Sequence, residues 1–306
     1  MSDVVAQTLA WLEAWHRVAL VEVSAVEGST PRPTGPTMAV RDDGLVVGSV
    51  SAGCVDGETH ALAIEALETG EPSTRRYAGP SDTPEDADVP ADLLDLGPTI
   101  MCGGAMTVTV RPLDASDAEA LRSELAAREA TRPLLLIYGA ADSAAALSQL
   151  GALLGRRVIV CDPRAVFTSP ARFPAAEVVV DRPERHFAKL LETGAVDTRT
   201  AVVVLTHDAR TEDPLLTHAL PSPVGYVGVL GSRRTHAARL DRLRAAGVPE
   251  ADLARLRGPV GLHLGGVTAA ETALSIVAEI VAADHGGTGL PLSATPAKIH
   301  PGEGAS

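Results

Sequence analysis

The chain has 306 residues, enough for two ordinary domains, and its hydrophobic (45%) and charged (21%) fractions are typical of globular proteins rather than disordered or fibrous ones. Its 26 Lys and Arg against 39 Asp and Glu give a formal charge of −13, which argues against nucleic acid as a partner but leaves room for local anion sites. No apolar run approaches the roughly 20 residues that cross a bilayer, so we expect a cytoplasmic protein without membrane association.

Residues 1–115 are predicted to form a small mixed α+β domain. Apolar spacing favours helices and β-rich alternation favours strands, with Gly and Pro marking the turns between them. The expected elements are a helix around 9–15, strands over 18–26, 38–41, 45–51 and 106–110, and a helix over 57–69. Residues 71–92, rich in Pro, Asp and Ser, are expected to be an exposed, mobile loop.

The second half alternates apolar strands with helices, which is typical of a parallel sheet covered on both faces. We expect a helical connector over 116–131, a Rossmann-like doubly wound domain over 132–285 and a disordered tail over 286–306. Thr268 and Glu271 form a capping-box pattern at the start of the last helix. The predicted strands cover 134–138, 158–161, 178–181, 201–206 and 224–230.

The three cysteines do not make a disulfide framework, and without a Cys-x-x-Cys pattern no metal site is expected. Cys54 precedes a predicted helix, whose N-terminus would stabilise a thiolate, although a small buried side chain is the alternative. Cys102 is followed by Gly103 and Gly104, which would let a ligand approach the main chain or would simply form a turn. Cys161 ends an apolar strand and is expected in the core.

A single cation, Arg32, lies between two prolines in the turn-rich segment 28–35. The restricted backbone suggests an anion clamp, whereas an ordinary surface loop with Pro and Gly for turn geometry is the alternative.

In the second domain, Gly-Ala-Ala-Asp at 139–142 occupies the place of a dinucleotide-binding turn but has only its first glycine, and Asp142 would repel a pyrophosphate. Asp162 ends the second strand, where an acid either holds ribose hydroxyls or is a solvated cap.

Two further strand ends carry polar residues at the same expected edge of the sheet. His207 follows the fourth strand, and Gly231, Ser232, Arg233 and Arg234 follow the fifth. Because cations at a helix start oppose the helix dipole, the arginine pair favours a phosphate site over a solvated helix end. His236 and His207 are candidates for the same crevice, although lone histidines are more often structural.

Taken together, these segments resemble the ordered signatures of the XdhC/CoxI family, the accessory proteins of xanthine dehydrogenase. The resemblance spans nearly the whole chain and both domains. It is carried by Gly-Ser-Thr-Pro-Arg-Pro at 28–33, Gly-Ser-Val-Ser-Ala-Gly-Cys-Val-Asp at 48–56, Asp-Leu-Gly at 95–97, Cys-Gly-Gly at 102–104, Asp-Pro-Arg at 162–164, Thr-His at 206–207 and Gly-Ser-Arg-Arg-Thr-His at 231–236.

The resemblance implies a molybdopterin-type cofactor, its sulfuration and its insertion into an apo xanthine dehydrogenase-type enzyme, with a cysteine desulfurase as a second partner. Cys54 would be the leading cofactor contact or transfer thiol, Cys102 the second contact, and 231–234 the phosphate or nucleotide site. Such a protein delivers a cofactor rather than turning over a substrate. Two departures are the 139–142 turn and His263, where the family has a Gly-Ala-Gly-His turn and an acid.

Two alternatives stay open: a Rossmann oxidoreductase that uses NAD(P), which the degraded glycine pattern disfavours, and a divergent scaffold paralogue. Because Rossmann sheets and small β domains often pair, we also expect a homodimer.

Overall fold

The computed structural model describes residues 4–27, 34–78, 104–114 and 116–295 and divides the chain into two compact units, Met1–Ala130 and Thr131–Ser306. Both predicted fold classes are confirmed: a mixed α+β first unit and a doubly wound parallel second unit. Among the described residues, no helix is both long and apolar enough to span a bilayer.

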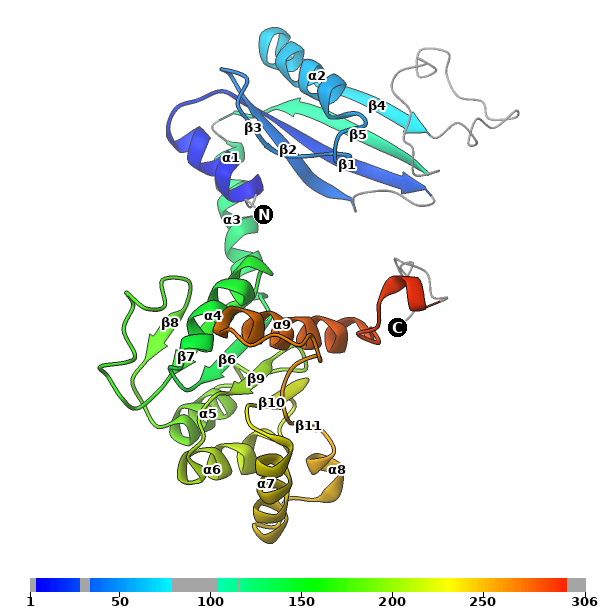
Figure 1. Cartoon of the computed structure of the whole chain (residues 1–306). Coiled ribbons are helices and arrows are strands. Elements are labelled where there is room, and N and C mark those ends of the chain that lie inside the picture. Colours follow the sequence, from blue (N-terminus) through cyan, green and yellow to red (C-terminus); the bar gives the residue numbers. More distant parts are fainter. Residues whose placement is uncertain (1–3, 28–33, 79–103, 115, 296–306) are drawn as a thin grey trace. The chain divides into compact units, whose positions relative to one another are not determined.

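The described part of the first unit forms an antiparallel sheet of order β3-β2-β1-β5-β4 (Figure 1). Its strands are β1 (Val18–Glu27), β2 (Gly35–Arg41), β3 (Val46–Gly48), β4 (Ser73–Ala78) and β5 (Ala105–Pro112). The helices are α1 (Val4–Glu13), α2 (Asp56–Thr69) and α3 (Asp117–Ala130).

The two faces of this sheet bury separate apolar clusters because successive strand residues point to opposite sides. Along β1, Val21 packs in the cluster that includes Leu62 of α2, whereas Leu20 packs in the cluster that includes Leu9 of α1 and Leu121 of α3. The helix predicted as a connector is therefore part of the first unit.

One prediction for this unit is wrong: residues 73–78 are a strand, β4, rather than part of a mobile loop. β4 pairs with β5 at the edge of the sheet and fully buries only Tyr77. An edge strand with one solvated face tolerates the polar run from Ser73 to Arg76. Because this run lacks apolar alternation, the sequence did not predict the strand. Residues 79–92 of the predicted loop lie outside the described residues.

The second unit is a parallel sheet of order β11-β10-β9-β6-β7-β8, with helices on both faces (Figure 1). Numbered from its first strand, this is the 3-2-1-4-5-6 order of dinucleotide-binding folds. The strands are β6 (Leu134–Tyr138), β7 (Arg157–Cys161), β8 (Glu177–Val179), β9 (Ala201–Val204), β10 (Tyr226–Val229) and β11 (Leu256–Arg257). The helices are α4 (Asp142–Leu153), α5 (Pro183–Glu192), α6 (Ala209–Ala219), α7 (Arg233–Ala245), α8 (Glu250–Leu253), α9 (Ala269–His285) and the short η2 (Leu292–Ala294).

Alternate residues of β6 again serve two cores. Leu136 belongs to the cluster with α5, α6 and α7, and Ile137 to the cluster with α4 and α9. The predicted capping box is confirmed, since the Thr268 hydroxyl accepts from the Glu271 amide while the Glu271 carboxylate accepts from the Thr268 amide. Part of the tail predicted to be disordered, 286–295, is described and includes η2, whereas 296–306 lie outside the described residues.

Candidate functional site

The loops that follow β6, β7 and β9 line a cavity of about 850 Å³ in the second unit. Helix α4 leaves β6 toward one face of the sheet, whereas α6 leaves β9 toward the other. The loops after β6 and β9 therefore diverge, which is how a doubly wound sheet opens its ligand crevice. Residues of the turns 139–142, 162–167 and 205–208 line the cavity, together with Arg172 and Leu230.

The turn after β6 brings its backbone very close to the loop after β9. Gly139 has φ +112°, and a Cβ there would lie 2.9 Å from the Thr206 amide nitrogen, so only glycine fits. Asp142 begins α4 with a side chain that is 92% exposed, and Arg172 Nη2 lies 3.3 Å from its Oδ1. Because this carboxylate already brings negative charge to the helix N-terminus, a ligand phosphate is disfavoured there.

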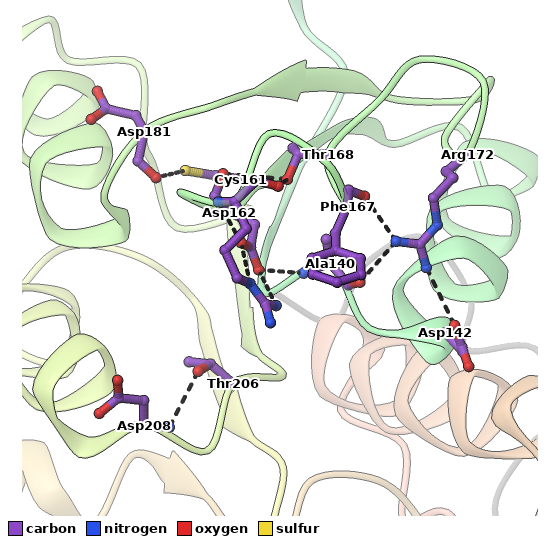
Figure 2. A network of polar contacts seen from close by, with 11 residues as sticks. Ala140, Asp142, Cys161, Asp162, Phe167, Thr168, Arg172, Asp181, Thr206 and Asp208 are labelled. Carbon is purple, nitrogen blue, oxygen red and sulfur yellow. Dashed lines mark hydrogen bonds and ion pairs between the residues drawn. The ribbon is translucent and has the colours of Figure 1, made fainter.

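Asp162, at the end of β7, lines the cavity but is fully engaged by the protein. Oδ2 accepts from the Ala140 amide at 2.9 Å and from Arg164 Nη2 at 2.8 Å, while Oδ1 accepts from the Arg164 amide and Nε, both at 2.9 Å. Figure 2 shows the contact between Asp162 and Ala140. Burial raises the pKa of Asp162, but the hydrogen bonds from Arg164 and Ala140 outweigh it, and the net pKa is lowered.

The same loop contributes an arginine and an aromatic ring to the cavity wall. The Arg164 guanidinium carbon lies 4.9 Å from the centre of the Phe167 ring. Arg172 fastens the loop, because its Nη1 donates to the carbonyls of Phe167 and Ala140, at 2.9 and 3.3 Å (Figure 2). The sequence predicted Asp162 as a site residue but missed Arg164, Phe167 and Arg172. The Asp-Pro-Arg spacing at 162–164 was the available signal.

The loop after β9 supplies His207, which lines the cavity with an exposed side chain. Its neighbour Asp208 caps α6 by accepting from the Arg210 amide at 3.0 Å, and the Asp208 amide donates to Thr206 Oγ1 at 3.2 Å. The pKa of Asp208 is lowered by the hydrogen bonds from Arg210. These contacts hold the loop while leaving the His207 ring available to a ligand.

The segment 231–234 begins α7 immediately after Leu230, which lines the cavity. Ser232 is the N-cap, and its hydroxyl accepts from the Thr235 amide at 3.1 Å. Arg233 and Arg234 are exposed, and neither has an ion-pair partner within the part of the chain that the structure describes. The segment itself is not among the residues that line the cavity; it adjoins the rim at Leu230.

His236 is placed differently from the other predicted site residues. Its ring packs on the backbone of Gly258, where a Cβ would lie 2.1 Å from Nδ1, and this nitrogen is buried without a hydrogen-bond partner among the described residues. Burial lowers the pKa of His236, and the charge of Arg239 lowers it further. These contacts give the ring a packing role between α7 and the segment that follows β11.

In the first unit, Cys54 is exposed and lies two residues before α2. The loop that carries it folds around the Asp56 carboxylate, which accepts from the amides of Val50 and Ser51 and from the hydroxyls of Ser49 and Ser51, at 2.7–3.1 Å. Ala52, at φ +58°, makes the turn that presents the thiol. Gly104 is buried just before β5, while Arg32, Cys102 and Gly103 lie outside the described residues.

The two described cysteines are expected to differ sharply in reactivity. Burial, followed by the charge of Asp181, raises the pKa of Cys161 to about 12, and the thiol donates to the Asp181 carbonyl. At pH 7.5 it therefore holds almost no thiolate, whereas Cys54 is open to reagent. Iodoacetamide labelling of the native protein, read by peptide mass spectrometry, should modify Cys54 and spare Cys161. Equal labelling of both would contradict this assignment.

Comparison with known proteins gives matches over both units. A family model described as the XdhC Rossmann domain matches residues 135–280, and one described as the XdhC and CoxI family matches 11–78. A crystal structure described as a xanthine dehydrogenase from Bacillus halodurans superposes with a TM-score of 0.72 over 97% of this chain and 98% of that one, at 22% sequence identity. That likeness concerns the fold.

Three relatives are each 30% identical to this chain. The molybdenum cofactor insertion chaperone PaoD of Escherichia coli matches over 85% of this chain and 81% of its own length. An uncharacterised E. coli protein, YqeB, matches over 86% of this chain, and a probable xanthine dehydrogenase subunit of Bacillus subtilis matches over 49%. The chain spans less than half the length of these two, 43% and 42%.

Proposed function

The chain belongs to the XdhC and CoxI family, and from that premise we propose that it binds a molybdopterin-type molybdenum cofactor as cargo. It supports sulfuration of this cofactor and its insertion into an apo xanthine dehydrogenase-type hydroxylase. Its partners are that enzyme and a cysteine desulfurase, and the chain acts as a carrier rather than an enzyme.

The observation that carries the proposal is the 850 Å³ cavity at the switch point of the Rossmann sheet, in a chain related to a cofactor insertion chaperone. The lining combines apolar surface with a few polar groups, among them His207 and Arg164, which suits a ring system with hydrogen-bonding edges. The exposed guanidiniums of Arg233 and Arg234 next to Leu230 supply positive charge for the phosphate of the cargo.

NAD(P)-dependent oxidoreduction, the alternative enzyme function, is less well supported by the same residues. Asp142 brings negative charge to the helix that would hold the pyrophosphate. The Asp162 carboxylate, which would hold the ribose, already accepts four hydrogen bonds from the protein.

In the first unit, Cys54 is proposed as the thiol that contacts the cofactor or supports its transfer, because it is exposed on a fixed loop. Thiolates are suitable ligands for soft metals. The other proposed cofactor contacts in this unit are Gly104, Arg32, Cys102 and Gly103. The homodimer stays a prediction from the sequence.

The proposal is tested by mixing cofactor-loaded protein with the apo-hydroxylase and measuring both cofactor retention and the hydroxylase activity gained. The double variant Arg233→Ala/Arg234→Ala is expected to bind molybdopterin roughly 10- to 100-fold more weakly, because charge-assisted hydrogen bonds to phosphate are lost. Arg244→Ala, at the other end of α7 and paired with Glu250, is the control and should bind normally.

An unchanged affinity of the double variant for molybdopterin would show that the arginine pair does not contact the cofactor, but it would not reject the proposed delivery function. Failure of the loaded wild-type protein to activate the apo-hydroxylase beyond free cofactor would reject the delivery function.

A further inference from the structure

The cavity wall that follows β7 holds a guanidinium in a fixed plane. Arg164 donates through Nε and Nη2 to both oxygens of Asp162 and lies over the ring of Phe167. Despite these contacts the Arg164 side chain is 60% exposed, and Phe167 is 46% exposed. A planar cation that already rests on one aromatic ring and is open to solvent has room for a second ring.

Asp162 contributes to this wall by orienting the guanidinium of Arg164. A carboxylate offers about four acceptor positions, and the Asp162 side chain, 3% exposed, already accepts four hydrogen bonds. A ligand hydroxyl could bond to it only by displacing the Ala140 amide or Arg164. Asp162 is therefore a positioning residue, and the group that faces the cavity is the guanidinium.

The paired acid and arginine do not by themselves mark a site, because the chain repeats the pattern. Asp197 pairs with Arg199, and Asp208 with Arg210, with similar bonds from the amide, Nε and Nη2 of the arginine. Of these three Asp-x-Arg pairs in the described residues, only Asp162 and Arg164 both line the cavity, and the Arg164 guanidinium lies over the ring of Phe167.

The loop is also rigidly attached to its neighbour. The Asp162 carboxylate holds the Ala140 amide, and Arg172 donates to the carbonyls of Ala140 and Phe167. Ala140 is thus bonded through both of its backbone groups, so that the platform and the turn after β6 form one fixed wall. Pre-formed surfaces of this kind bind without a large cost of ordering.

We infer that the guanidinium of Arg164, supported by Phe167 and held by Asp162, is the stacking platform for a planar heterocycle bound in the cavity. The ligand class is a pterin or a nucleobase, which share a flat π face. The inference rests on the proposed function, whose cargo has such a ring, and it assigns the ring end of the cargo to the loop after β7. The phosphate end then belongs at the other side of the opening, near α7, because Asp142 disfavours it at α4.

The test is calorimetric titration of the full chain with unsubstituted pterin, with cytidine, guanosine and adenosine, and with inorganic phosphate. Arg164→Lys keeps the charge and loses the plane, so the favoured ring should bind about tenfold more weakly. Phe167→Leu should give a smaller loss, and Arg199→Lys, the same exchange in an acid-arginine pair outside the cavity, none. Preference for pterin over the nucleosides, or the reverse, identifies which ring the platform takes.

Asp162→Asn supplies the readout for a positioning role. It should weaken ring binding when Arg164 is present and add little when Arg164→Lys is already in place. Equal losses in both backgrounds would show that Asp162 touches the ligand directly and would overturn its assigned role.

The platform is overturned if no ring binds the wild-type protein, if Arg164→Lys binds the rings as tightly as wild type, or if only inorganic phosphate depends on Arg164. These outcomes are separate from failure of the proposed function. If rings bind in a manner that depends on Arg164 but the protein never carries molybdopterin, the proposed function is rejected and the stacking role of Arg164 is retained. If wild type and Arg164→Lys load molybdopterin equally, the stacking role is rejected and the proposed function is retained.

Discussion

Replacing Glu212 by alanine is expected to lower the free energy of unfolding of the second unit by about 3–5 kcal/mol, because it leaves a buried guanidinium without its counter-charge. The Arg239 side chain is 0% exposed and donates through Nε and Nη2 to the two Glu212 oxygens, at 3.1 and 3.0 Å. Arg242 also donates to Glu212 at 3.0 Å. Thermal unfolding should show a drop of roughly 10 °C.

This ion pair bears on the candidate site as well as on stability. Arg239 Nη2 donates to the Leu230 carbonyl at 3.1 Å, directly before the segment 231–234. Loss of Glu212 should therefore also loosen the start of α7, where the proposed phosphate contacts lie.

Two controls separate burial from simple loss of an acid. Glu250→Ala removes a solvent-exposed carboxylate paired with Arg244 and should leave the melting temperature unchanged, because exposed ion pairs contribute little. The double variant Glu212→Leu/Arg239→Met should recover most of the loss, since an apolar pair needs no charge compensation. A melting temperature for Glu212→Ala equal to that of wild type would show that Arg239 reaches solvent or another partner.

Cys54→Ser is expected to abolish most of the activation of the proposed client hydroxylase while leaving the fold intact. A serine hydroxyl fits the same exposed position, but it does not ionise near neutral pH and is a poor ligand for a soft metal. The hydrogen bonds to Asp56 hold the loop in either case. The measurement is hydroxylase activity regained per mole of added protein.

Cys161→Ala is the matched control: it removes a buried thiol and should activate the client normally for each folded molecule. Asp56→Ala retains the thiol but removes the carboxylate that orders its loop, so a partial loss is expected. Full activation by Cys54→Ser would rule out a role for this thiol in delivery.

The four inner strands of the second unit's sheet, β6, β7, β9 and β10, could be predicted closely because they are apolar runs, and the last helix carries the capping residue Thr268. The edge strand β11, only two residues long, could not be predicted. Strand β4 could not, because an edge strand that buries one tyrosine has almost no apolar alternation. The pattern of apolar residues predicts a strand whose side chains are strongly buried. Where few side chains are buried, only pairing with a neighbouring strand determines whether the segment is a strand.

The candidate site was predictable only in part for a similar reason. Strand ends locate Asp162, His207 and the segment 231–234, because parallel strands deliver their loops to one edge. Whether a carboxylate still has free lone pairs depends on which donors the fold brings to it. The contact of Asp162 with Ala140 and the position of Phe167 under Arg164 arise from the path of the loop, which no spacing in the sequence specifies.

The central claim, that this chain carries a molybdopterin-type cofactor, is tested most directly by native mass spectrometry of protein purified from cells that synthesise molybdopterin. The account predicts an added mass that corresponds to the cofactor on the wild-type chain, and its strong reduction in Arg233→Ala/Arg234→Ala. A wild-type chain that carries no added mass, or that carries NAD(P) instead, would contradict it.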